Sequence, residues 1–93
     1  MLFMYIHTHT PENCIANKPD DMKKMASKMQ EDAKKAGIKV VGSYVANHEH
    51  TNYVIFEAGD LAALEKGLLP MTLRGTARLI PIITLDQTIA MFE

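Results

Sequence analysis

Residues 2–10 read Leu2-Phe3-Met4-Tyr5-Ile6-His7-Thr8-His9-Thr10, and the architecture of the chain follows from them. Because side chains alternate along a strand, the stretch would present two different faces. One face carries Leu2, Met4 and Ile6, and the other carries Phe3, Tyr5, His7 and His9. A strand that is apolar on both faces belongs in the middle of a sheet that is covered on both sides. We therefore predict a central strand whose C-terminal end presents two imidazoles on one face.

The composition is that of one small globular domain over residues 1–93, with 47% hydrophobic and 23% charged residues. The formal net charge is −1, so no basic excess is present to neutralise phosphates. We expect neither a nucleic-acid partner nor a membrane partner. The single cysteine, Cys14, excludes an internal disulfide and suits a reducing compartment. With no signal-peptide pattern and no apolar run of membrane length, the sequence predicts a cytoplasmic protein.

The remaining elements follow from periodicity and from turn residues. Residues 11–19, with two prolines, read as a loop, and an amphipathic helix runs from Pro19 to a stop at Gly37. Strands are predicted over residues 38–46, 53–58 and 76–84, with Pro81 placing the last at a sheet edge. A short helix over 61–69 should end at Pro70. Thr84 and Gln87 match a capping box that opens a last helix.

The resulting order is strand, helix, strand, strand, helix, strand, with a helical tail. Right-handed crossovers turn this order into an α+β fold of the ferredoxin-like β-α-β-β-α-β type, a four-stranded antiparallel sheet with its helices on one face. Two helices cover only one side of the sheet, yet the strands are apolar on both sides. We therefore expect a homodimer in which the two open sheet faces pack together.

Four stretches of this sequence resemble those of a known superfamily. They are residues 7–12 (HTHTPE), 42–44 (GSY), 54–60 (VIFEAGD) and 79–82 (LIPI). The chain is similar to the dimeric α+β barrel superfamily, and within it to a little-characterised group of short stand-alone domains. The resemblance covers most of the chain and implies a sheet-to-sheet dimer around small pockets. It says little about activity, because the superfamily includes oxygenases, isomerases, haem-handling enzymes, metal binders and ligand domains of transcription factors.

The four histidines form two His-x-His pairs, His7/His9 and His48/His50. In the predicted topology both pairs lie at one end of the sheet, about 10 Å apart across one intervening strand. They could converge on a transition metal such as zinc, nickel, copper or iron, with Glu12, Glu49 or Cys14 completing the ligand set. The plainer alternative is a polar turn, residues 48–50, with solvated histidines. Cys14 by itself reads as an ordinary thiol, since no catalytic cysteine signature surrounds it.

A second group of candidates would line a pocket between the two sheets. Tyr5, Tyr44 and Tyr53 would give it aromatic walls, although tyrosines on a strand are often simple core residues. Glu57, if buried, could have a raised pKa and act as an acid or base together with His7 or His9. Glu57 could equally cap the following helix or form an ion pair.

These observations lead to three functional hypotheses. The first is a homodimer that binds a small ligand or a transition metal at the histidine-rich end, with any catalysis metal-assisted or carried by His and Glu. The second is a cofactor-independent enzyme of the monooxygenase or isomerase kind, with His7 or His9 as general base. The third is a non-catalytic sensor or partner domain. No phosphate loop, G-x-S-x-G elbow or C-x-x-C pair supports other chemistry.

Overall fold

The computed structural model describes residues 1–14 and 18–93. Its main elements are β1 (Leu2–His9), α1 (Pro19–Lys35), β2 (Lys39–Ala46), β3 (Thr51–Glu57), α2 (Leu61–Thr72), β4 (Gly75–Ile82) and α3 (Leu85–Ala90), with two 3-10 turns, η1 (Pro11–Asn13) and η3 (Asn47–Glu49). The predicted β-α-β-β-α-β order is confirmed. Of the loop predicted over residues 11–19, η1 forms the beginning, and residues 15–17 lie outside the described residues.

The four strands form one antiparallel sheet in the order β2-β3-β1-β4. β1 is central, as its two apolar faces predict: Tyr5 lies opposite Val54 of β3 and Leu79 of β4. β4 is an edge strand, as Pro81 predicts, since proline within a sheet is tolerated mainly on edge strands. β1 and β2 are each antiparallel to β3, so they run in the same direction. The end of β1 and the β2–β3 connection therefore lie at one end of the sheet.

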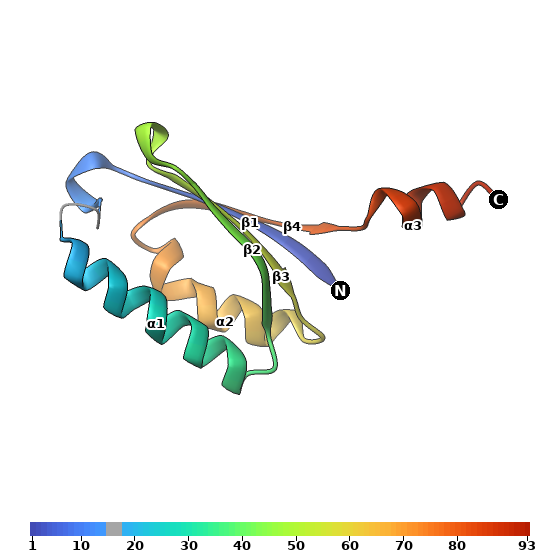
Figure 1. Ribbon diagram of the computed structural model, residues 1–93, viewed down its shortest axis with the longest axis horizontal. Coiled ribbons are helices and arrows are strands. Elements are labelled where there is room, and N and C mark those ends of the chain that lie inside the picture. The colour runs from blue at the N-terminus through green and yellow to red at the C-terminus, as the bar shows by residue number, and fades with distance from the viewer. Residues whose placement is uncertain (15–17) are drawn as a thin grey trace.

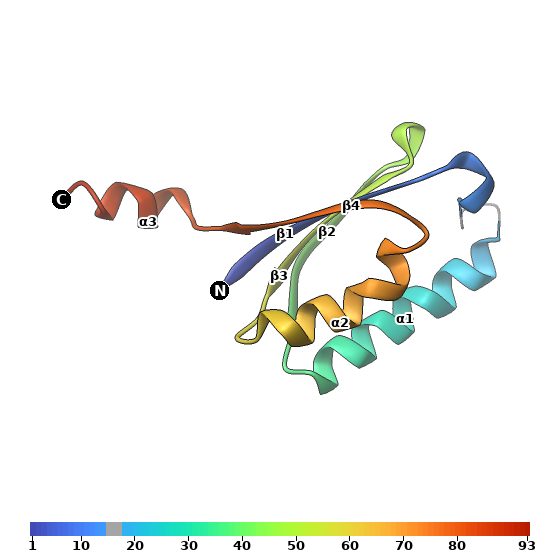
Figure 2. The ribbon, with the colours of Figure 1, turned by 180° about the vertical axis from the view of Figure 1, so that it is seen from behind.

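Both α1 and α2 lie on the same face of the sheet (Figures 1 and 2). The core forms between this face and the helices, from Phe3, Tyr5, Ile38, Val54, Phe56, Ala58, Leu64 and Leu68. Most of these residues come from the inner strands β1 and β3 and from α2. Met25, Met29 and Ala33 of α1 are only half-buried, which leaves space between α1 and the rest of the core.

The helix ends follow the sequence signals in most places. Pro19 occupies the first turn of α1, and Gly37 after its end has φ of 72°, the left-handed conformation that favours glycine. The side chain of Asp60 accepts a hydrogen bond from the Ala62 N–H at the start of α2. Thr84 and Gln87 form both arms of the predicted capping box at α3.

The predicted end of α2 at Pro70 is wrong, because the helix continues to Thr72 with Pro70 in its last turn. A proline removes its own N–H from the helix but leaves the bonds of its neighbours intact, and the N–H of Leu73 still reaches the carbonyl of Leu69 at 3.0 Å. The extra turn carries Met71 and Thr72 over the end of the sheet.

Among residues 1–14 and 18–93, no layer covers the face of the sheet opposite the helices. This face carries seven partly exposed apolar residues: Leu2, Met4, Ile6, Tyr53, Ile55, Ile80 and Ile82. We call these residues the open face. α3 does not cover it, because the chain beyond β4 extends away from the body of the domain as an arm (Figure 1). On this arm Leu85 is 74% and Phe92 86% exposed.

Candidate functional site

Three of the four histidines meet at the end of the sheet where β1 finishes. His7 and His9 project from β1 toward the helix side, and the ring of His9 lies 6.0 Å from that of His7 and 5.4 Å from that of His50. His50 follows η3 in the left-handed conformation, with φ of 51°. His48 is exposed within η3. Both His-x-His pairs were predicted at this end of the sheet, and it is His50, rather than His48, that lies beside β1.

A potential metal-binding group is formed by His9, Cys14 and His50. One ligand atom from each of the three side chains lies within 4.8 Å of the other two. All three side chains are half-buried. Two imidazole nitrogens and one thiolate sulfur are a donor set suited to zinc and to other first-row transition metals. The group thus includes Cys14 and leaves out His48.

Backbone and side-chain hydrogen bonds hold the three donors in place. The N–H of His9 donates to the carbonyl of His50 at 3.1 Å, which ties the β2–β3 connection to β1. The hydroxyls of Thr8 and Thr51 lie 3.0 Å apart across the same strands. Cys14 follows η1, and its N–H donates to the carbonyl of Pro11 at 3.2 Å. The donors therefore come from three chain segments, and a backbone hydrogen bond joins those of His9 and His50 directly.

Two nitrogens of this group are buried without a partner. Nε2 of His9 and Nδ1 of His50 make no hydrogen bond among the described residues. Burial lowers the pKa of His9, and the charges of His50 and Arg74 lower it further. His9 is therefore held neutral at physiological pH, which is the form of imidazole that binds a metal.

His7 differs from His9, although both project from the same face of β1. It is 3% exposed, and its ring stacks on Tyr5 with ring centres 5.9 Å apart. Neither of its ring nitrogens has a hydrogen-bond partner among the residues described. Burial is the main cause of its lowered pKa, followed by the charge of His9, while the nearby Met71 carbonyl opposes the shift without forming a hydrogen bond of good geometry.

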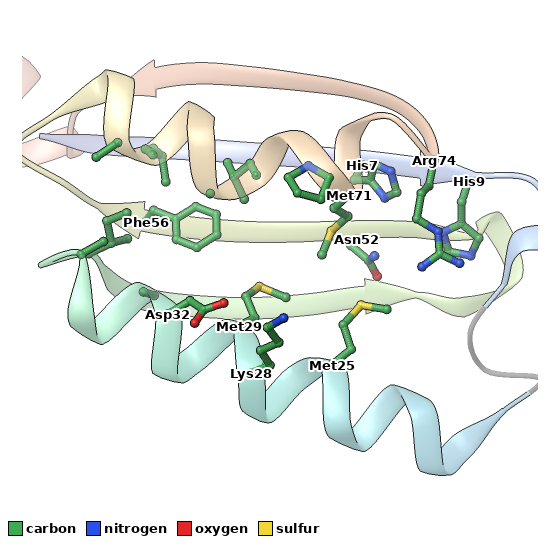
Figure 3. Close-up of a pocket in the computed structure, with 18 of the residues that line it drawn as sticks. His7, His9, Met25, Lys28, Met29, Asp32, Asn52, Phe56, Met71 and Arg74 are labelled. Carbon is green, nitrogen blue, oxygen red and sulfur yellow. The ribbon is translucent and has the colours of Figure 1, made fainter.

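His7 and His9 line one end of a cavity of about 360 Å³ between the sheet and the two long helices (Figure 3). The other lining residues discussed below are Met25 and Met29 of α1, Asn52 and Phe56 of β3, Leu64 and Met71 of α2, and Arg74. The sequence predicted a pocket between the sheets of two chains, whereas this cavity lies between the sheet and the helices of one chain. The cavity lies there because the inner face of α1 is only half-buried and leaves space between the helix and the sheet.

The three tyrosines do not share a site. Tyr5 is buried on the helix side, and burial raises its pKa; its hydroxyl lies 2.8 Å from Oγ1 of Thr72. Tyr44 and Tyr53 face each other across β2 and β3 on the open face, where Tyr44 is exposed. Glu57 is also exposed. It therefore lacks the burial on which its predicted acid–base role depended. The sheet itself separates these residues from His7.

Two site residues had no strong signal in the sequence. One is Arg74, which lines the cavity beside the histidines. Gly75 permits this arrangement, since a Cβ there would collide with the Thr8 carbonyl and come within 3.1 Å of Nε2 of His7. The pair Arg74-Gly75 at the start of the last strand is the only clue in the sequence, because glycine often marks a close approach of two strands.

Fold and site together define a small α+β domain with a ferredoxin-like order and a group of histidine and cysteine donors at one end of its sheet. In the described residues no helix is both long and apolar enough to cross a bilayer. Residues 1–93 match the family described as "Domain of unknown function (DUF3303)". The chain belongs to this family. A comparison with curated proteins gives no match.

Proposed function

We propose that this protein binds a transition metal through His9, Cys14 and His50. The observation that carries the proposal is the mutual approach of three donor atoms within 4.8 Å. A tetrahedral zinc ion with bonds of about 2.0 Å to nitrogen and about 2.3 Å to sulfur separates its ligands by about 3.3–3.6 Å. Metal binding would therefore bring the donor atoms together by at most about 1.5 Å. Two unpartnered buried nitrogens support the same conclusion, since a metal would complete their bonding.

Three protein donors leave one tetrahedral position for water or a substrate. Such an open position distinguishes catalytic zinc sites from closed structural ones. Zinc fits the mixed nitrogen and sulfur donors best, while copper, nickel and iron accept the same atoms. Any reaction at this position would be assisted by the metal, with His7 nearby at the end of the cavity.

Metal binding is tested by titrating tag-free, reduced protein with zinc against a chromophoric chelator, after elemental analysis of the protein as purified. We expect about one zinc ion per chain. Cys14→Ser and His50→Ala should each weaken binding by about tenfold or more, because losing a ligand costs at least as much as losing a group that orients one. Zinc should also slow alkylation of the Cys14 thiol.

His48→Ala is the matched control, since His48 is an exposed histidine only two residues from His50. It should bind zinc as the unaltered protein does. If His48→Ala abolishes binding while Cys14→Ser preserves it, the ligands are the four histidines and the proposed group is wrong. No zinc binding by the unaltered, reduced protein would overturn the function itself.

A second candidate function is acid–base catalysis by His7 on a ligand in the cavity, of the isomerase or cofactor-independent monooxygenase kind. Its support is a neutral, buried imidazole with two unpartnered nitrogens beside an apolar cavity. A neutral imidazole can accept a proton at one nitrogen and donate at the other. This function needs no metal, so metal-free protein retains it.

We also propose that the protein is a homodimer whose copies pack open face to open face. The face spans roughly 19 by 26 Å, or about 500 Å² per copy, for four strands spaced ~4.8 Å apart with ~3.3 Å per residue. A stable interface buries about 800 Å² per partner. The arm with α3 supplies the remaining surface, since its apolar side chains are unpacked in the single chain. A six-residue helix also needs such support, because isolated helices shorter than about 12 residues are marginal in water.

A further inference from the structure

The cavity under the helices has a polar end and an apolar end. Phe56 and Leu64 line it away from the histidines, and Met25, Met29 and Met71 extend its apolar wall. The polar end is formed by His7, His9, Asn52 and Arg74 (Figure 3). The volume of about 360 Å³ is at the lower end of the roughly 300–1,000 Å³ usual for ligand sites. A small ligand with one polar and one apolar part matches this division.

The polar end favours a negative charge. Arg74 carries a guanidinium group, whose planar set of donors matches a carboxylate. Its backbone is fixed, since its N–H donates to the Met71 carbonyl at 3.0 Å and its own carbonyl accepts from Nδ2 of Asn13 at 3.4 Å. Asp32 also lines the cavity, but it lies on the far side from Arg74 (Figure 3).

His7 gives independent evidence that a ligand belongs here. It is 3% exposed, it lines the cavity, and neither of its nitrogens is hydrogen-bonded within the described part of the chain. A buried polar group without a partner costs about 1–3 kcal/mol. The polar head of a ligand would remove this cost, because a neutral imidazole donates one hydrogen bond to an oxygen atom.

We propose that the cavity binds a small amphipathic carboxylic acid, with its carboxylate held by Arg74 and His7 and its apolar body between the methionines and Phe56. The site goes beyond metal binding and does not depend on it, since neither Arg74 nor His7 belongs to the metal-binding group. An apolar body gains about 25 cal/mol for each Å² removed from water, and the charged head sets the orientation.

The head group is tested by calorimetric titration with octanoate, octan-1-ol and octylamine, which share one apolar chain. Octanoate should bind about tenfold or more tightly than octan-1-ol, and octylamine should bind most weakly. The titrations are run on metal-free and on zinc-loaded protein. Equal binding of octanoate and octan-1-ol, or no binding of any of the three, would overturn the proposal. So would octanoate binding that occurs only with zinc, because the metal would then hold the carboxylate.

Arg74→Gln should weaken octanoate binding about tenfold and leave octan-1-ol binding unchanged. Arg78→Gln is the matched control, since Arg78 is an exposed arginine on β4 whose position alternates onto the open face. If the Arg78 variant loses as much affinity as the Arg74 variant, the effect is general charge and the proposed contact is wrong. The head-group series on the unaltered protein decides the question even if a variant folds poorly.

The position of the ligand is read from the methyl resonances of labelled methionines. Met25, Met29 and Met71 line the cavity, whereas Met91 lies on the arm and is 73% exposed. Octanoate should shift the three cavity methyls and leave Met91 in place. Shifts confined to Met91, or to Met4 on the open face, would place the acid outside the cavity and contradict the proposal.

Discussion

At the scale of single residues, two histidines on the same face of one strand have different surroundings. His9 lies beside Cys14 and His50, so its lone pair is available to a metal. His7, two residues earlier on β1, stacks on Tyr5 and borders the cavity. Burial lowers the pKa of both, and for each it is the largest cause. The shared environment keeps both rings neutral, while their neighbours decide what each ring can bind.

The lowered pKa of His7 makes stability depend on pH. In the unfolded chain His7 titrates near 6.5, so below that pH the unfolded state binds more protons than the folded state. The contribution of neutral His7 to the free energy of unfolding is fully present above pH 6.5. It is lost as the pH falls toward the lower pKa that His7 has in the folded state. The free energy of unfolding of metal-free protein, measured in urea at pH 7.5 and 5.5, should therefore drop at the lower pH.

His7→Gln should make this drop smaller, because glutamine does not titrate. The same substitution at the exposed His48 is the control and should leave the drop as it is. A pH dependence that is identical in His7→Gln and in the unaltered protein would show that burial of His7 does not penalise its protonation.

At the scale of elements, the last turn of α2 connects the helix layer to the end of the sheet. The helix passes through Pro70, and this places Met71 at the cavity and Thr72 against the buried hydroxyl of Tyr5. The following turn then delivers Arg74 to the polar end of the cavity. An α2 that ended before Pro70 would leave these groups without a fixed position.

Thr72→Val tests this contact, since valine keeps the shape of threonine and removes its hydroxyl. The buried Tyr5 hydroxyl loses its partner, and the free energy of urea unfolding should fall by about 1–3 kcal/mol. Thr76→Val, at an exposed position of β4, should change it by less than about 0.5 kcal/mol. Equal effects of the two substitutions would mean that the turn after Pro70 does not pack on Tyr5.

At the scale of the whole molecule, the single chain is more extended than a compact domain of its length. Its radius of gyration is 14.4 Å, against about 12 Å for a compact chain of this size. The arm beyond β4 accounts for the long axis (Figure 2). The open face and the arm are both apolar and uncovered in the described residues, and the proposed homodimer would cover both.

Sedimentation equilibrium should therefore give twice the chain mass of 10.4 kDa. Ile55→Glu places a charge in the middle of the open face and should produce monomers that keep their helical circular dichroism. Leu69→Glu is the control, because Leu69 is a 53% exposed apolar residue of α2, on the helix layer. It should stay dimeric. A monomeric mass for the unaltered protein at high micromolar concentration would contradict the dimer.

The sequence by itself determined the order of elements, the central place of β1 and the edge position of β4. These follow from local rules, since alternation, turn residues and capping side chains act over a few positions. Pro70 does not mark the end of α2, because the helix continues to Thr72 and the Leu73 N–H still reaches the Leu69 carbonyl. The histidine-rich end was also visible, because antiparallel pairing alone brings His9 and His50 together.

Only the tertiary structure decided which donors meet and where the cavity lies. Cys14 joins the histidines because η1 folds back beside β1, a contact between segments that no spacing in the sequence encodes. The cavity depends on how far α1 stands from the sheet, and the place of Arg74 depends on the last turn of α2. These features arise from packing between distant segments, whereas sequence patterns report the period of each segment separately.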